Sequence, residues 1–352
     1  MTDLDLSRQI PVVLLTGFLG SGKTTLLQRL VRQPGMQGTA VIVNEFGEIA
    51  LDHDLIEVGE ETVIELDGGC LCCTVKSELM DTLKDLYRRH VQTKIELRRV
   101  VIETTGLADP VPILAGLLAD TFVGHFFRLA AVVTLVDAVS GGVTLSRHEE
   151  ARRQVAVADR LILTKLDMVT TGSEVTESLR RLNPTAPIAQ ASMGDVEMSF
   201  VLEDGLYDPG TKTVDVQAWL RAEAFEPADH HHHDHAHDHH HDHDHHDVNR
   251  HSERIRAFCL RRDEPVPTQA FEDFLNALRF ARGPDLLRVK GIVCLAEEPE
   301  HPLVFHAAQH AIHPTVSLDQ WPSEDRTTRI VFIVDDIEPH QIESMLDSLA
   351  AC

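Results

Sequence analysis

The eight residues Gly17-Phe18-Leu19-Gly20-Ser21-Gly22-Lys23-Thr24 match the phosphate-binding pattern G-x-x-x-x-G-K-[ST]. The apolar run Pro11–Leu15 precedes them and the amphipathic segment Lys23–Arg32 overlaps their end, which predicts a strand, a loop and a helix. Glycines let such a loop wrap around phosphates, and the helix N-terminus supplies positive potential. Lys23 is predicted to reach the β- and γ-phosphates, and Thr24 to bind Mg²⁺.

The chain before residue 229 continues this alternation of apolar runs and amphipathic segments. The predicted strands are Pro11–Leu15, Ala40–Val43, Val63–Leu66, Val100–Ile102, Ala130–Val136 and Arg160–Leu163. The predicted helices are Lys23–Arg32, Lys76–His90, Pro112–Ala119, Arg147–Ala158 and Ser173–Leu182. Alternating strands and helices predict an α/β fold, a P-loop NTPase with a mostly parallel sheet covered by helices.

One segment departs from this composition. Residues 229–247 contain twelve His, six Asp and one Ala, and therefore no side chain that builds a core. We predict a solvated linker here, which separates residues 1–228 from a smaller C-terminal α/β domain at 248–352. The elements predicted in that domain are strands at Ile255–Arg262, Leu287–Leu295, Leu303–Ala307 and Arg329–Val334, and helices at Thr268–Phe280 and Pro339–Ala350.

The overall composition restricts the partners and the compartment. The 352 residues include 32 Lys or Arg and 56 Asp or Glu, a net charge of −24, which argues against nucleic acid as a partner. The longest apolar run, Leu129–Val136, is far shorter than the ~20 residues of a membrane helix. The N-terminus lacks the pattern of a secretory signal, so a cytoplasmic location is predicted. Six cysteines are too few for a disulfide scaffold.

Two loops are predicted to complete the phosphate site. The segment Glu103-Thr104-Thr105-Gly106 follows a predicted strand, and ligands bind at this end of strands in open α/β sheets. Glu103 is predicted to hold Mg²⁺, directly or through water, and the amide of Gly106 to meet the γ-phosphate. Alternatively, Glu103 caps the next turn. Asn44–Gly47 follows the second strand and is either a first switch loop or an ordinary turn.

The segment Thr164-Lys165-Leu166-Asp167 has the spacing of the guanine-reading N-K-x-D loop. Asp167 is able to accept hydrogen bonds from guanine N1 and N2, a donor pattern that adenine lacks, and the stem of Lys165 is able to cover the ring. Thr164 occupies the first position of the pattern. The spacing of Lys165 and Asp167 after a predicted strand nevertheless predicts guanine nucleotides as the ligands.

Three cysteines gather at Cys70, Cys72 and Cys73, within Gly68-Gly69-Cys70-Leu71-Cys72-Cys73. Thiolates are favoured ligands of Zn²⁺ and Cu⁺, and a glycine-rich loop lets three of them face one ion. A tetrahedral zinc site leaves a fourth position for water, a carboxylate such as Glu48, a His or a recipient protein. The alternative is three small buried residues, although adjacent residues of one strand do not share a face.

Together these motifs resemble the CobW-type metal-handling GTPases, relatives of the nickel-insertion GTPases for urease and hydrogenase. Thr164 departs from the Asn usual at that position. Essentially the whole chain takes part, although the C-terminal RVKG is less specific. The resemblance rests on LLTGFLGSGKTTLL around Gly17–Thr24, NEFGE at Asn44–Glu48, GGCLCC at Gly68–Cys73, ETTGLADP at Glu103–Pro110, TKLD at Thr164–Asp167 and RVKG at Arg288–Gly291.

The resemblance implies GTP hydrolysis coupled to delivery of zinc, or alternatively cobalt or nickel, to a client metalloprotein. It implies a GTPase domain at 1–228, a metal-binding His/Asp tract at 229–247 and a CobW-like domain at 248–352. Its expected ligands are GTP or GDP, Mg²⁺ and Zn²⁺. The expected nucleotide contacts are Gly17, Gly20, Ser21, Gly22, Lys23, Thr24, Thr25, Gly106, Thr164, Lys165 and Asp167, with catalytic roles for Lys23, Thr24 and Glu103.

Three alternatives stay open at this point. One is a cobalt-handling GTPase of the type that matures cobalamin or nitrile hydratase. The second is a metal storage or buffering protein whose nucleotide site is vestigial. The third is a P-loop kinase for a small metabolite, which the cysteine triplet does not support.

Overall fold

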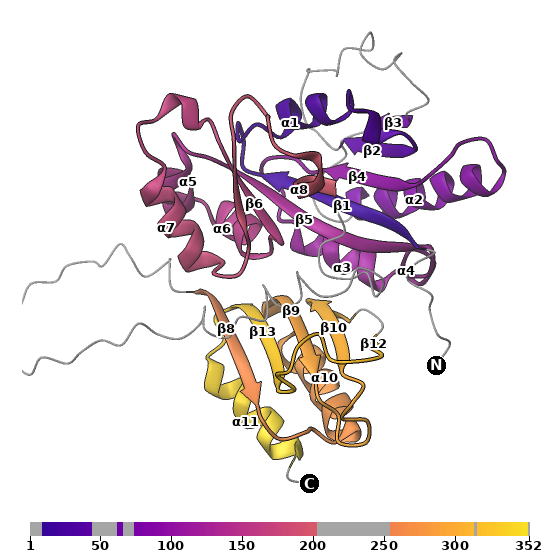
Figure 1. Cartoon of the computed structure of the whole chain (residues 1–352), viewed down its shortest axis with the longest axis vertical. Helices are drawn as coiled ribbons and strands as arrows, with labels where there is room; N and C mark the ends of the chain where they lie inside the picture. Colours follow the sequence, from indigo (N-terminus) through magenta and orange to yellow (C-terminus); the bar gives the residue numbers. More distant parts are fainter. Residues whose placement is uncertain (1–8, 44–61, 66–73, 203–253, 313–314, 351–352) are drawn as a thin grey trace, which may run out of the picture.

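The computed structural model describes residues 9–43, 62–65, 74–202, 254–312 and 315–350 (Figure 1). Its N-terminal domain is built on a seven-stranded sheet of order β3-β2-β4-β1-β5-β6-β7. Each pairing in this sheet is parallel. The prediction of a mostly parallel sheet is therefore confirmed. The strands are β1 (Ile10–Gly17), β2 (Thr39–Val43), β3 (Thr62–Glu65), β4 (Arg99–Glu103), β5 (Phe127–Asp137), β6 (Arg160–Thr164) and β7 (Ile188–Ala191).

Helices cover both faces of this sheet, because its central strands alternate apolar side chains between the two sides. On β1, Val13 and Leu15 pack into the cluster that includes α1, while Val12 and Leu14 pack into the cluster that includes α2 and α3. Burial on both sides is the reason for the uninterrupted apolar runs of these strands. The helices are α1 (Lys23–Leu30), α2 (Thr74–Val91), α3 (Val111–Ala119), α4 (Thr121–Phe126), α5 (Gly141–Arg147), α6 (Glu149–Ala156), α7 (Ser173–Leu182) and α8 (Met198–Leu202).

The predicted helix Arg147–Ala158 corresponds to α6, which is two residues shorter at each end. The chain forms α5 up to Arg147 and then α6 from Glu149, and His148 between them is extended (φ −118°, ψ 119°). Glu149 and Glu150 occupy the first turn of α6, where acidic side chains favour a helix start. This pair of acidic residues therefore marks the start of α6 in the sequence.

Besides α5, three helices or strands of the N-terminal domain were not predicted, namely α4, β7 and α8. The start of α4 carries a recognisable signal, because the Asp120 carboxylate accepts hydrogen bonds from the backbone N–H of Phe122 and of Val123, each 3.0 Å long. Asp is a favoured N-cap residue, so Asp120 marks a new helix directly after α3. The other two are only four and five residues long, too short for a periodic signal.

The C-terminal domain consists of an antiparallel sheet of order β11-β10-β9-β13-β8, with β12 paired to β10. Helices α10 and α11 pack on one face of this sheet through an apolar core that includes Phe271, Phe274, Phe332 and Leu346. The predicted strand Ile255–Arg262 and the final helix have the expected bounds. The elements are β8 (Ile255–Arg262), α10 (Thr268–Arg282), β9 (Leu286–Val293), β10 (Leu303–Ala308), β11 (Ala311–Ile312), β12 (Val316–Ser317), β13 (Thr328–Asp335) and α11 (Pro339–Ala350).

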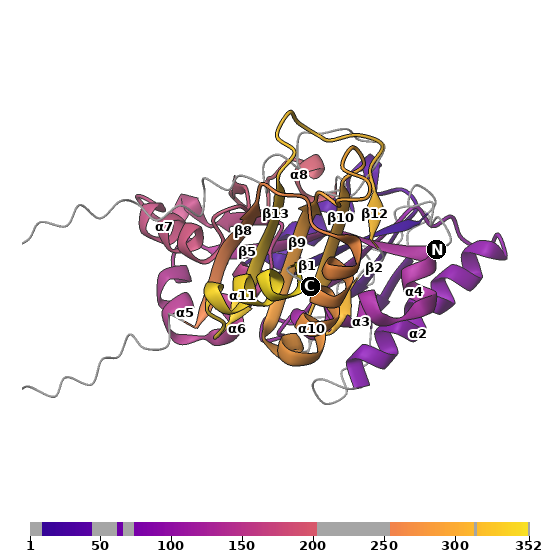
Figure 2. The same ribbon diagram turned by 90° about the horizontal axis from the view of Figure 1, so that it is seen from below.

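The other face of the C-terminal sheet packs against the N-terminal domain. Figure 2 looks onto α10 and α11, with the C-terminal sheet behind them and the N-terminal domain beyond it. Ile255, Ala308 and Ile333 of the C-terminal sheet share one apolar cluster with Val111 and Leu114 of α3. The two domains are therefore joined by a continuous core.

A buried ion cluster crosses this junction. The Asp159 carboxylate, only 2% exposed, accepts hydrogen bonds from the backbone of Val132 (2.8 Å), from Arg288 (2.8 Å) and from Lys290. Burial raises the pKa of Asp159, but the charges of Arg288 and Lys290 outweigh it and lower the pKa overall. Burial, together with repulsion from Arg288, lowers the pKa of Lys290 to about 7. The RVKG segment thus supplies two cations to one buried acid.

Candidate functional site

The phosphate-binding pattern forms a loop between β1 and α1, as predicted. Gly17, Gly20 and Gly22 have φ values of 143°, 73° and 96°, a region that disfavours residues with a side chain. A Cβ on Gly17 would lie 2.4 Å from the carbonyl oxygen of Leu135 on the neighbouring strand. Only glycine fits there, so the pattern is explained by the backbone path and by contact with β5.

Lys23 begins α1 and turns its ammonium group back onto the loop. Its Nζ donates hydrogen bonds to the carbonyl oxygens of Gly17 (2.8 Å) and Phe18 (3.4 Å), and the residue is 8% exposed. The positive charge is therefore held beside the loop backbone. It lies at the N-terminus of a helix, where partial positive charge already favours anions.

Thr24 and Glu103 meet across the sheet edge. Glu103 is the last residue of β4 and lies beside Leu15 of β1, so the parallel register brings it to the loop. The Thr24 hydroxyl donates to Glu103 Oε1 at 3.1 Å, and Glu103 is 2% exposed. A hydroxyl and a carboxylate oxygen are the hard ligands that Mg²⁺ takes in proteins, so the donor set fits this ion.

The loop after β4 lies directly against the phosphate-binding loop. A Cβ on Gly106 would lie 2.6 Å from the backbone nitrogen of Leu19, so only a glycine permits this approach. The buried hydroxyl of Thr104 donates to that of Thr16 on β1 (2.8 Å). From α6, Gln154 donates to the carbonyl oxygens of Gly106 (3.2 Å) and Ala108 (3.0 Å). Thr16 and Gln154 were not predicted as site residues, because Thr16 precedes the first position of the phosphate-binding pattern and Gln154 belongs to none of the motifs.

The TKLD segment follows β6 and is tied to the phosphate-binding loop by its first residue. The Thr164 hydroxyl donates to the carbonyl oxygen of Ser21 at 2.8 Å and to that of Val136 at 3.3 Å. Thr164 is buried, with 5% of its surface exposed. A threonine at this position therefore serves as a clamp between two loops, a role that the sequence pattern did not reveal.

Lys165 and Asp167 have different surroundings. Lys165 adopts a left-handed backbone conformation (φ 58°) and its Nζ donates to Asp137 Oδ2 at 2.7 Å. Burial raises the pKa of Asp137, but hydrogen bonds from Lys165, Val139 and Ser140 outweigh it and lower the pKa overall. The Asp167 carboxylate is exposed and has no partner among the described residues. It is thus accessible to a ligand at the carboxyl edge of the sheet.

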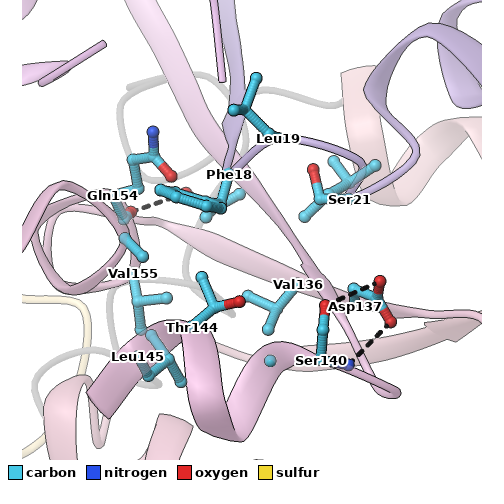
Figure 3. Close-up of a pocket in the computed structure, with 14 residues that line it drawn as sticks. Phe18, Leu19, Ser21, Val136, Asp137, Ser140, Thr144, Leu145, Gln154 and Val155 are labelled. Carbon is cyan, nitrogen blue, oxygen red and sulfur yellow. Dashed lines mark hydrogen bonds between the residues drawn. The ribbon is translucent and has the colours of Figure 1, made fainter. Parts of the chain in front are cut away.

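A small cavity lies beneath the loop (Figure 3). It extends from Phe18 and Ser21 to Asp137 at the end of β5 and to Ser140 directly before α5, and α6 closes its far side with Gln154. Its volume is about 20 Å³, which is room for one or two water molecules and not for a nucleotide. The candidate phosphate site is accordingly the rim of the loop.

Several predicted features lie outside the described residues: Asn44–Gly47, Cys70, Cys72, Cys73 and the His/Asp tract. The described chain brackets the cysteines, because β3 ends at Glu65 and α2 begins at Thr74. Val43 of β2 pairs with both Glu65 and Glu103, so β3 ends at the same edge as the phosphate site.

The described residues add three findings on metal binding and membrane spanning. Among the described residues, no group of three or more His, Cys, Asp or Glu is arranged to hold a metal ion, and none of their helices is long and apolar enough to cross a membrane. Burial raises the pKa of the Cys259 thiol to about 11. This thiol is therefore a poor metal ligand at neutral pH.

Comparison with known proteins agrees with this geometry. Two family models match the chain: "CobW/HypB/UreG, nucleotide-binding domain" over residues 11–190 and "Cobalamin synthesis protein cobW C-terminal domain" over residues 255–350. The zinc chaperone YjiA of Escherichia coli K12 is 30% identical over 341 residues, covering 97% of this chain and 98% of that protein.

Two further comparisons concern a relative that matches part of this chain and a solved structure. The zinc chaperone CobW of Pseudomonas aeruginosa is 31% identical over 230 residues, covering 55% of this chain and 60% of that protein. The crystal structure of Zn(II)-bound YjiA GTPase from E. coli has a TM-score of 0.70 at 26% identity, covering 97% of this chain and 99% of that one. The likeness to YjiA thus extends over both domains.

Proposed function

The chain belongs to the CobW/HypB/UreG family, and on that premise we propose that it hydrolyses GTP and couples hydrolysis to delivery of zinc to a client metalloprotein. The observation that carries the proposal is the meeting of three distant segments at one sheet edge. Thr24 contacts Glu103, Gly106 lies against Leu19, and Thr164 contacts Ser21. These contacts assemble the parts of a nucleotide site in a chain that resembles a zinc chaperone along 97% of its length.

The hydrolytic step is transfer of the γ-phosphoryl group to water. Such transfers depend on positioning and on electrostatic stabilisation of charge on the phosphoryl oxygens. Lys23 and the amides of the loop bind the β- and γ-phosphates, and Gly106 offers its N–H from the opposite side. Thr24 and Glu103 would hold Mg²⁺, which would neutralise charge on the phosphates when bound. The remaining expected loop contacts are Gly17, Gly20, Ser21, Gly22 and Thr25.

Guanine selection is assigned to the TKLD segment. The exposed Asp167 carboxylate has no described partner, so a base is able to use both of its oxygens. Lys165 is anchored on Asp137, which orders its stem for contact with the ring. Thr164 fixes the segment to the phosphate loop, so that the base and the phosphates are bound at a set separation.

Metal handling is assigned to Cys70, Cys72 and Cys73, with the His/Asp tract at 229–247 as a weak reservoir. The cysteines follow β3, whose last residue Glu65 lies at the nucleotide edge. The five residues from Glu65 to Cys70 span at most about 18 Å, so the thiolates lie within reach of that edge. We assign residues 1–228 to the GTPase domain and 248–352 to the C-terminal domain.

The decisive experiment measures GTP turnover with and without one equivalent of zinc. We expect zinc to change the rate in the natural chain and to have no effect when Cys70, Cys72 and Cys73 are replaced by Ser. The matched control is Cys259→Ser, which removes a thiol with a raised pKa and should leave the zinc response intact. Zinc binding without any GTP hydrolysis would instead identify a metal buffer. Parallel titrations with cobalt and nickel test the choice of metal.

A further inference from the structure

Two neighbouring residues of α6 hold the loop that follows β4. Gln154, of which 1% is exposed, donates to the carbonyl oxygens of Gly106 and Ala108. Arg153 donates from Nη1 to Asp109 Oδ2 at 2.9 Å. The loop is thus fixed to one helix at three points along four residues. A movement of Gly106 therefore strains or breaks contacts with α6.

The same Arg153 also reaches the C-terminal domain. Its Nη2 donates to Asp335 Oδ2 at 2.6 Å, and the Asp335 side chain is 6% exposed. Asp335 is the last residue of β13, which lies between β9 and β8 in the C-terminal sheet. The guanidinium is planar and rigid, so it satisfies both carboxylates only while Asp109 and Asp335 keep their present separation.

Asp109 provides a second connection to the same sheet. Its Oδ1 accepts a hydrogen bond from the N–H of Val111 at 2.9 Å, which caps the start of α3. Val111 and Leu114 of α3 pack with Ala308 and Ile333 of the C-terminal sheet. A shift of Asp109 therefore acts on the C-terminal domain both through Arg153 and through α3.

We propose that Arg153 is a positioning residue that transmits the nucleotide state of the Gly106 loop to the C-terminal domain. This inference rests on the proposed function, because it requires a γ-phosphate that contacts Gly106. Binding of GTP moves the loop, changes the Arg153–Asp109 contact, and thereby changes how firmly Asp335 and the end of β13 are held. The Gly106 loop and Arg153 thus form one element whose conformation depends both on the nucleotide and on the C-terminal domain.

The junction offers a matched control for this bridge. Arg254 lies with its Nε 3.2 Å from Asp335 Oδ1, but the only described side chain with which it makes an ion pair is Asp335, so it does not reach the loop. The two domains are anchored independently by Asp159 with Arg288 and Lys290. Variants of Arg153 are therefore expected to fold with their domains docked.

The test is hydrogen–deuterium exchange of the full chain with GDP–Mg²⁺ and with the non-hydrolysable analogue guanosine 5′-(β,γ-imido)triphosphate–Mg²⁺. In the natural chain, exchange in the 103–111 loop and in 328–335 should differ between the two nucleotides, the latter by roughly fivefold or more. Arg153→Gln should keep the difference in the loop and lose most of it in 328–335, where the packing of α3 against Ile333 carries the remainder. Arg254→Gln should keep both, and Arg153→Lys should restore part of the lost difference. A natural chain whose loop responds while 328–335 does not would overturn the inference.

A second measurement separates this inference from the proposed function. If the natural chain binds no guanine nucleotide, the proposed function fails, and the bridge is then judged in the nucleotide-free protein. There we would compare Asp109→Asn, Asp335→Asn and the double variant by chemical denaturation. Non-additive stability changes support a shared contact through Arg153, while additive changes refute it.

Discussion

Asp159 and Asp167 lie just before and just after β6, yet the fold uses them in opposite ways. Asp159 at the start of the strand is buried against the C-terminal domain and bound by Val132, Arg288 and Lys290. Asp167 beyond the end of the strand is exposed and has no described partner. One end of the strand thus uses its carboxylate to dock a domain, and the other leaves its carboxylate available for a ligand. The first should govern stability and the second nucleotide recognition.

The largest effect on stability is expected at Asp159, the residue that docks the start of β6 onto the C-terminal domain. Asp159→Asn removes the negative charge beside Arg288 and Lys290, so the buried Arg288 guanidinium loses the carboxylate with which it is paired. Breaking a buried ion pair from one side costs about 3–5 kcal/mol, and we expect a loss of this size in the free energy of unfolding. Urea denaturation measures it.

The control for this prediction is Asp195→Asn. Asp195 pairs with Arg29 at 3.5 Å, and their side chains are 86% and 47% exposed, so its loss should have little effect. Equal stability of the two variants would show that the buried cluster does not hold the domains together.

The ligand end should respond in the opposite way. Asp167→Asn should weaken GTP binding at least tenfold, because hydrogen bonds to a charged group are worth about 1.5–3 kcal/mol, and should relax discrimination against xanthosine triphosphate. Its unfolding free energy should stay unchanged. Titration with a fluorescent GTP analogue is the measurement, with the exposed Glu177→Gln on α7 as control. If the natural chain bound ATP as tightly as GTP, the assigned role of Asp167 would be wrong.

The free energy of unfolding should also depend on pH through Lys290, which contacts Asp159 at the start of β6. Its pKa of about 7 lies below that of an unfolded lysine, near 10.4, so between these values the unfolded chain binds more protons. The stability contribution should therefore rise with pH from about 7 towards 10, by up to about 1.4 kcal/mol per pH unit. Lys290→Met should lack this rise in denaturation experiments across that range. Parallel curves for both chains would contradict the shifted pKa.

The smallest effect is expected at the clamp between the loops. Thr164→Val removes the hydroxyl that donates to Ser21 and leaves that carbonyl without its bond, at a cost of about 1 kcal/mol in stability. Nucleotide affinity should fall modestly, since the loop at Ser21 and the TKLD segment, to which we assign base recognition, are then less firmly connected. Thr164→Ser keeps the hydroxyl and should behave as the natural chain does. Calorimetric titration of GDP into the three proteins provides the comparison.

The sequence by itself determined the local order of elements and the type of sheet. Glycines at Gly17 and Gly22, an apolar run before them and an amphipathic segment after them are contiguous, so pattern and backbone conformation identify the loop without knowledge of the fold. The final helix Pro339–Ala350 and the strand Ile255–Arg262 were predicted with their observed bounds for the same reason. Helix α5 was not predicted, because its seven residues are too few for a clear periodic signal.

Only the tertiary structure decided which distant residues meet. Asp159 and Arg288 are 129 residues apart and Thr164 and Ser21 are 143 apart, and each pair is brought together by strand order and domain docking. The Arg153 bridge between Asp109 and Asp335 likewise joins residues that carry no shared local pattern. Periodicity reports what one segment buries, whereas partners for buried charges depend on which surfaces pack together. That information arises only when the whole chain folds.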